Sequence, residues 1–112
     1  MDDLLKRLRD YGADVDGAME RFMDDKQLYA DCLQVFKEDP GFDELDAALG
    51  RADYRSAFNY AHMLKGVAAN MGLAPMTAAL SGIVEPLREH RCDNLDRVYK
   101  AVLSERQRMR AL

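Results

Sequence analysis

Hydrophobic residues recur along most of the chain at spacings of three and four positions, which is the period of an amphipathic α-helix. Over residues 15–22, for example, Val15, Ala18, Met19 and Phe22 follow the i, i+3, i+4, i+7 pattern. No segment alternates apolar and polar residues with the Val, Ile and Thr enrichment of a half-buried strand. Good helix formers such as Ala, Leu, Met and Glu dominate instead. The pattern therefore predicts an all-α fold.

Capping and turn residues divide this pattern into separate helices. Asp24 and Asp53 are predicted N-caps, because a short carboxylate side chain can accept a hydrogen bond from a free N–H of the first turn. Gly50 and Gly72 are predicted C-caps, since glycine readily adopts the left-handed conformation that often ends a helix. The run Asp39-Pro40-Gly41 is a further stop signal. The helices are expected at about residues 2–10, 14–22, 24–38, 42–49, 53–71, 75–90 and 93–109.

Four of these segments are long, and the connections between them are short, as is typical of antiparallel neighbours. We therefore predict an antiparallel four-helix bundle with short additional N-terminal helices, formed by residues 1–112 as a single helical domain. The residues expected to be buried lie on one face of segment 24–38 and on one face of segment 53–71. They are Leu28, Tyr29, Cys32, Leu33 and Phe36 on the former, and Ala57, Tyr60, Ala61, Leu64, Val67, Ala68 and Met71 on the latter.

Composition and charge argue against several classes of function. The formal net charge of −4 disfavours sequence-independent binding of nucleic acid, because such binding needs a basic surface. The chain has no uninterrupted apolar run of about 18 residues, so no membrane span is expected. The opening Met-Asp-Asp lacks the pattern of a secretory signal, and we expect a cytoplasmic protein with reduced thiols at Cys32 and Cys92. The cysteines and histidines lack the close spacing of a zinc site, so no intrinsic metal is expected.

His62 departs from the pattern that packing alone would produce. On a helical wheel of residues 53–71, drawn at roughly 100° per residue, it lies at the edge of the apolar face and is expected to project into solvent. Gly66 follows one turn later, where a mid-helix glycine costs about 1 kcal/mol relative to alanine. Either Gly66 leaves room for another molecule, or it is a tolerated surface residue. Lys65 is a helical neighbour of His62 at i+3 and could neutralise an anion bonded to the imidazole.

One segment of this helix resembles the signature of histidine-containing phosphotransfer (HPt) domains, the phosphocarriers of two-component phosphorelays. It reads Ala61-His62-Met63-Leu64-Lys65-Gly66-Val67-Ala68-Ala69-Asn70-Met71-Gly72-Leu73. The family pattern is a histidine, a lysine three positions later, a glycine directly after it, and a small residue near the helix end. His62, Lys65, Gly66 and Gly72 match it. Residues 11–22 and 53–58 are also similar to single-domain members, so the resemblance covers about residues 11–90.

The resemblance implies a carrier rather than a kinase or other enzyme. By position, His62 would be the nucleophile that takes a phosphoryl group from an aspartyl phosphate on a receiver domain, or donates one to it. Lys65 would balance the phosphate charge, and Gly66 would leave room for phosphate and partner. The implied partners are response-regulator receiver domains and a hybrid sensor kinase. Mg²⁺ would come from the receiver, with no cofactor intrinsic to this chain, and the absence of a glycine-rich phosphate loop argues against an ATP site.

Three neighbours of His62 on the same helix are candidate partner-binding residues, namely Phe58, Met63 and Ala69. Phe58 could equally lie at the edge of the core. Transient signalling contacts tend to be small, with an apolar centre and a polar rim, and these side chains would suffice for one.

HPt domains often carry a polar side chain that hydrogen-bonds the other ring nitrogen and fixes its tautomer. Gln34 and Lys37, on the preceding helix, are the candidates for this role beside His62. The main alternative to a phosphocarrier is a non-catalytic helical interaction adaptor with the same bundle. A small hydrolase with His62 as general base is disfavoured, because no third residue that would orient the base is evident.

Overall fold

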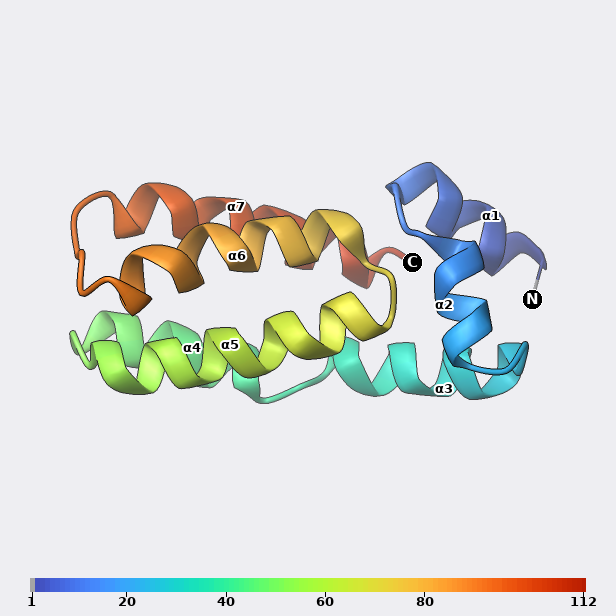
Figure 1. Ribbon diagram of the computed structural model, residues 1–112, viewed down its shortest axis with the longest axis horizontal. Coiled ribbons are helices and arrows are strands. Elements are labelled where there is room, and N and C mark those ends of the chain that lie inside the picture. The colour runs from blue at the N-terminus through green and yellow to red at the C-terminus, as the bar shows by residue number, and fades with distance from the viewer. Residues whose placement is uncertain (1) are drawn as a thin grey trace.

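The computed structural model describes residues 2–112, which form seven α-helices and no strand (Figure 1). In chain order the helices are α1 (Asp2–Tyr11), α2 (Val15–Arg21), α3 (Lys26–Lys37), α4 (Gly41–Gly50), α5 (Tyr54–Asn70), α6 (Ala74–Arg88) and α7 (Leu95–Arg110). The all-α prediction is confirmed, and the helix boundaries lie close to the predicted ones. None of the helices in the described range is long and apolar enough to cross a membrane.

Helices α4, α5, α6 and α7 form a four-helix bundle (Figure 1). Helix α5 packs along α4 and α6, and α6 packs along α7. Two side-chain hydrogen bonds connect α7 back to α4. The Tyr99 hydroxyl donates to Asp46 Oδ1 at 2.8 Å, and Arg106 Nη1 donates to Asp43 Oδ1 at 3.2 Å. Short turns join α4 to α5, α5 to α6 and α6 to α7, so consecutive bundle helices run antiparallel, and the predicted bundle with short N-terminal helices is confirmed.

The length of α3 predicts that it is one of the four bundle helices. In the structure it is not. Pro40 has no N–H to donate, and the chain turns at Asp39 and Pro40 before α4 begins. Most of α3 consequently lies beyond the end of the bundle (Figure 1). There the ring of Phe22, which ends α2, meets the ring of Tyr29 edge-on, with 5.1 Å between centroids. The buried Tyr29 hydroxyl, whose pKa burial raises to about 12, donates to the Met71 carbonyl at 2.8 Å and ties α3 to the end of α5.

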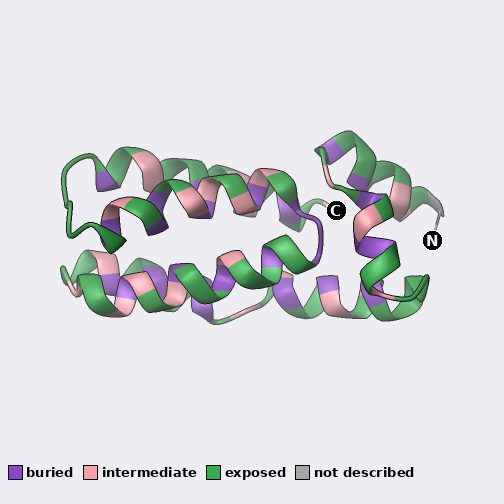
Figure 2. Ribbon diagram, viewed as in Figure 1, coloured by how far each residue is buried: buried purple, intermediate pink, exposed green. Residues whose placement is uncertain are grey.

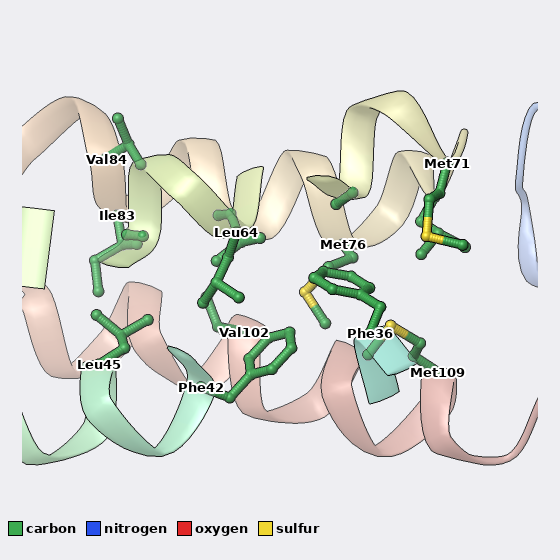
Figure 3. Packing of buried hydrophobic residues seen from close by; sticks show 14 of the residues in the cluster. Phe36, Phe42, Leu45, Leu64, Met71, Met76, Ile83, Val84, Val102 and Met109 are labelled. Carbon is green, nitrogen blue, oxygen red and sulfur yellow. The ribbon is translucent and has the colours of Figure 1, made fainter. Parts of the chain in front are cut away.

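The core runs along the inside of the bundle. Buried positions face inward and exposed positions face outward along each bundle helix (Figure 2). Near the middle, Phe42 of α4, Leu64 of α5 and Val102 of α7 point toward one another (Figure 3). No polar or charged residue of the described chain is buried. Packing of apolar side chains therefore holds the bundle together.

Two residues predicted to be buried are exposed. Leu28 retains 48% of its accessible surface, because at the start of α3 the helix face that carries Leu28 is left open while the adjacent Tyr29 is buried. Val67 retains 36% because it lies at the edge of the apolar stripe of α5, outside the face that α4 and α6 cover. Cys32 and Tyr60 are half-buried rather than buried. Both thiols, Cys32 and Cys92, are free, as predicted.

One of the two predicted aspartate N-caps is confirmed. The Asp53 carboxylate accepts a hydrogen bond from the Ser56 N–H at 3.2 Å and begins α5. The prediction for Asp24 is wrong. The N-cap of α3 is the next residue, Asp25, whose carboxylate accepts a hydrogen bond from the Leu28 N–H at 2.9 Å. Asp24 instead adopts a left-handed conformation with φ of 59°. Two consecutive aspartates offer the same capping chemistry, so the sequence does not distinguish them.

The two predicted glycine C-caps also differ in outcome. Gly72 has φ of +70° and ends α5 as expected. Its carbonyl accepts a hydrogen bond from the Asp14 N–H at 2.8 Å, which joins this turn to the start of α2. The prediction for Gly50 is wrong, because Gly50 is the last helical residue of α4. The left-handed residue after that helix is Ala52, with φ of 56°.

Gly72→Ala is expected to destabilise the protein by about 3 kcal/mol. The added Cβ would lie 2.5 Å from the Asp14 carbonyl oxygen, in a backbone conformation that L side chains rarely adopt. Gly82→Ala is the control, since a Cβ on this α6 residue would meet no atom within 4 Å, and should stabilise by about 0.5–1 kcal/mol. Urea denaturation measures both changes. Wild-type stability of Gly72→Ala would contradict the close approach.

Candidate functional site

Helix α5 holds His62 on its exposed face, near the middle of the helix. The adjacent Ala61 and the nearby Leu64 are completely buried, so the opposite face of α5 is fixed in the core. The imidazole therefore projects into solvent, as the helical wheel predicts. A rigid helix presents it at a defined place on the surface.

Gly66, one turn after His62, lies on open surface. A Cβ added there would meet no atom within 4 Å, so the packing of this chain gives no reason for a glycine. Its φ also lies in the ordinary helical range, so no turn requires it. What the glycine does provide is a bare stretch of backbone beside the imidazole.

The His62 ring makes one aromatic contact and no hydrogen bond within residues 2–112. It stacks on the Phe58 ring one turn earlier, with 5.6 Å between centroids and 21° between planes. The predicted orienting residues, Gln34 and Lys37, do not bond to it. Burial, and then the positive charge of Arg7 on α1, lowers the pKa of Lys37. Both ring nitrogens of His62 are left to solvent or to an incoming group.

Lys65 points from α5 toward α6. Its Nζ lies 4.0 Å from Glu85 Oε1, and Arg88 Nη2 lies 3.9 Å from the same oxygen. The Arg88 guanidinium in turn lies over the Phe58 ring, 5.7 Å from its centroid. Partly exposed pairs at these separations contribute little free energy. Lys65 is therefore held loosely, and its ammonium can turn to an anion that arrives at His62.

A shallow open hollow surrounds His62. Its lining consists of Arg21, His62, Met63, Gly66, Val67, Ala69 and Asn70. Two of the three predicted partner-binding residues, Met63 and Ala69, thus share a surface with the imidazole. Phe58 does not line this hollow and faces a separate groove that includes Tyr54 and Leu87.

Sequence reasoning missed three residues of the hollow, Arg21, Val67 and Asn70. Val67 is on the apolar stripe of α5 and is predicted to be core, but with Met63 it forms exposed apolar surface beside His62. Arg21 comes from α2, and its guanidinium donates to the carbonyls of Asn70 at 2.7 Å and Ala69 at 3.2 Å. No local signal could have placed Arg21 here, because the contact joins residues 49 positions apart.

Comparison with known families decides what kind of domain carries this site. A family model described as Hpt domain matches residues 2–109, nearly the entire chain. The chain belongs to the Hpt domain family. Searches of curated proteins and of solved structures gave no match. Membership supports a role in histidine phosphotransfer within phosphorelays, and Hpt domains are phosphocarriers without kinase activity.

An Hpt domain carries its phosphoryl group on a histidine, and this chain has two. His90 lies just after α6 in a tight turn, with φ of 56°. It lines the separate groove with Arg88, Arg91 and Cys92. His62 instead lies mid-helix beside Gly66, so the two imidazoles have different surroundings.

Proposed function

We propose that His62 is the phosphoryl-carrying residue of this Hpt domain and that it exchanges the group with the aspartate of receiver domains. The observation that carries this proposal is the exposed imidazole near the middle of α5, with uncovered backbone at Gly66 one turn away. A receiver must bring its aspartyl phosphate into line with a ring nitrogen, and a residue on open helix surface allows that approach.

In the accepting step, a lone pair on a ring nitrogen of neutral His62 attacks the phosphorus atom. The N–P bond forms as the P–O bond to the aspartate breaks, and the aspartate carboxylate leaves with that electron pair. The other ring nitrogen keeps its proton. We assign the attack to Nε2, because it lies at the tip of the ring. Donation to a second receiver reverses these bond changes.

Lys65 and Gly66 have supporting roles in this proposal. The Lys65 ammonium leaves its long contact with Glu85 and neutralises part of the phosphoryl charge. Gly66 gives clearance to the phosphoryl group and to the partner's backbone. Because the transfer depends mainly on positioning and charge neutralisation, these few groups suffice on the carrier side. We place Mg²⁺ with the receiver, not with this chain.

The receiver is proposed to dock on the hollow around His62. Met63, Val67 and Ala69 provide an apolar centre, and Arg21 lies at its rim. A small contact of this composition suits a partner that must dissociate after each transfer. A hybrid sensor kinase is the proposed source of phosphoryl groups, through its own receiver domain.

Labelling with potassium phosphoramidate, a chemical donor that phosphorylates histidine, tests this proposal without a known partner. The wild-type chain should acquire a label that acid removes and alkali does not, and peptide mapping should place it on His62. Response-regulator receiver domains are then mixed with the labelled chain, and at least one should discharge it. Label that a receiver discharges from His90 and not from His62 would move the site. Failure of every receiver to discharge the label would favour the adaptor.

A further inference from the structure

We propose that Phe58 is a positioning residue, which holds the His62 ring in the plane that phosphoryl transfer requires. The inference rests on the proposed function of His62. It assigns to an aromatic contact the orienting role that the family often gives to a hydrogen bond. The juxtaposition behind it is the stacked pair of rings at positions 58 and 62 of α5.

The first step concerns what restrains the imidazole. Within the described chain, His62 has no hydrogen bond or ion pair, and its side chain is exposed. The Phe58 ring, nearly parallel at 21° and 5.6 Å away between centroids, is the aromatic surface against which it rests. Offset stacking at this separation is a favourable arrangement of two rings. It disfavours side-chain rotamers that carry the imidazole away from Phe58.

The second step concerns what restrains Phe58. This side chain is half-buried and packs against the core cluster. The Arg88 guanidinium of α6 lies over its ring, in the arrangement of a cation–π contact. Phe58 is thus held from the neighbouring helix as well as from its own. Its packing against the core offers His62 a wall that is less mobile than a fully exposed side chain.

The third step concerns direction. Phe58 precedes His62 by one turn and Gly66 follows it by one turn, so both are helical neighbours of the imidazole at i±4. One neighbour is an aromatic wall, and the other has open space where a side chain would begin. The ring is therefore supported toward the start of α5 and accessible toward its end. A phosphoryl donor docked over the hollow approaches from the accessible side.

Orientation should matter most when a docked protein fixes the other reactant. A small donor can approach either nitrogen from many directions, whereas a receiver offers one line of attack. Loss of the stacking should therefore slow transfer to a receiver without slowing labelling by phosphoramidate. This difference separates positioning from a general loss of reactivity.

The experiment compares Phe58→Leu with Phe58→Tyr, and with Tyr54→Leu as the matched control one turn earlier on α5. Each variant is loaded with phosphoramidate and discharged by the receiver domain that discharges the wild type. At saturating receiver, Phe58→Leu should transfer about tenfold more slowly, with an unchanged half-saturating concentration. Phe58→Tyr should restore the rate, and Tyr54→Leu should match the wild type.

Three kinetic results would overturn the proposal. An unchanged rate of transfer to the receiver in Phe58→Leu would mean that the contact between the Phe58 and His62 rings does not contribute to transfer. A raised half-saturating concentration with an unchanged maximal rate would make Phe58 a docking contact. Equal slowing of phosphoramidate labelling would mean damage to the surroundings of His62. If no receiver discharges the wild type, it is the proposed function that fails, and this inference fails with it.

Proton NMR tests the stacking itself, whatever the partner. The carbon-bound ring protons of His62 should be shifted upfield by the ring current of Phe58 and should show cross-relaxation with its ring protons. Phe58→Leu should remove the shift and Phe58→Tyr should keep it. Should Phe58→Leu fail to fold, the wild-type spectrum and Phe58→Tyr still decide. Absence of the shift and of the cross-relaxation in the wild type would overturn the proposal.

Discussion

His62→Gln is expected to abolish the phosphoryl label that a receiver domain discharges, whereas His90→Gln should keep that label at the wild-type level. Glutamine is polar and of similar length but has no ring nitrogen with a nucleophilic lone pair. Because His62 is exposed and forms no hydrogen bond within the described chain, the substitution should change the free energy of unfolding by less than about 0.5 kcal/mol. ³¹P NMR after phosphoramidate treatment, before and after addition of the receiver domain, measures this label, and thermal denaturation measures stability.

The paired histidine variants make this result specific. Label that persists in His62→Gln and disappears in His90→Gln would assign the chemistry to the turn after α6. Label that persists in both variants would mean either that each histidine can carry it or that another residue does, and the double variant would separate these two cases. If His62→Gln loses the label and its melting temperature also falls steeply, unfolding would be the cause of the loss. We do not expect that outcome, because His62 lies on open surface.

Gly66→Leu is expected to slow discharge by a receiver by about a hundredfold, without loss of stability. The new side chain would occupy the open space one turn from the imidazole and keep the partner's backbone at a distance. Replacement of a mid-helix glycine should itself stabilise α5 by about 0.5–1 kcal/mol. A variant that is at least as stable as the wild type but does not discharge would separate docking clearance from folding.

Gly82→Leu is the matched control for this substitution. Gly82 is likewise a helical glycine with open space around its missing Cβ, but it does not line the hollow around His62. It should gain stability and keep the wild-type rate of discharge. Stopped-flow or quenched-flow assays of the labelled proteins measure the rates. Equal slowing in both variants, or a marked destabilisation by Gly66→Leu, would contradict the role given to Gly66.

Much of α5 could be predicted from local signals. Asp53 has the side chain that caps a helix start, and Gly72 tolerates the left-handed turn that ends it. Helical periodicity alone placed His62 on the exposed face. These signals act over one or two turns, and a single sequence carries them in full.

The arrangement of α3 and α4 was beyond such signals. Pro40 predicts a break, but it does not say whether the helices on either side fold back or follow one another along the molecule. The position of Val67 depends on which helices cover α5, and the position of Arg21 depends on a contact with a distant turn. Sequence periodicity gives the width of an apolar stripe, and the assembled bundle decides how much of it is buried.

The orienting group of His62 shows a different limitation. Knowledge of the family leads to a search for a hydrogen-bonding side chain on the preceding helix. The prediction that Gln34 or Lys37 bonds to the imidazole is wrong. Phe58 was visible at the right spacing on α5, but an aromatic residue at that spacing fits a core edge equally well. Only the geometry shows that its ring lies along the imidazole.

The link between α2 and the end of α5 has an electrostatic consequence for the histidine. Aligned peptide dipoles leave partial negative charge at the carboxyl end of a helix, and α5 ends two turns beyond His62. That end would repel a dianionic group carried nearby. The guanidinium of Arg21 covers the carbonyls of Ala69 and Asn70 and offsets their charge. In the proposed phosphoryl carrier, the small N-terminal helices would thus lessen the repulsion between this helix end and a phosphoryl group on His62.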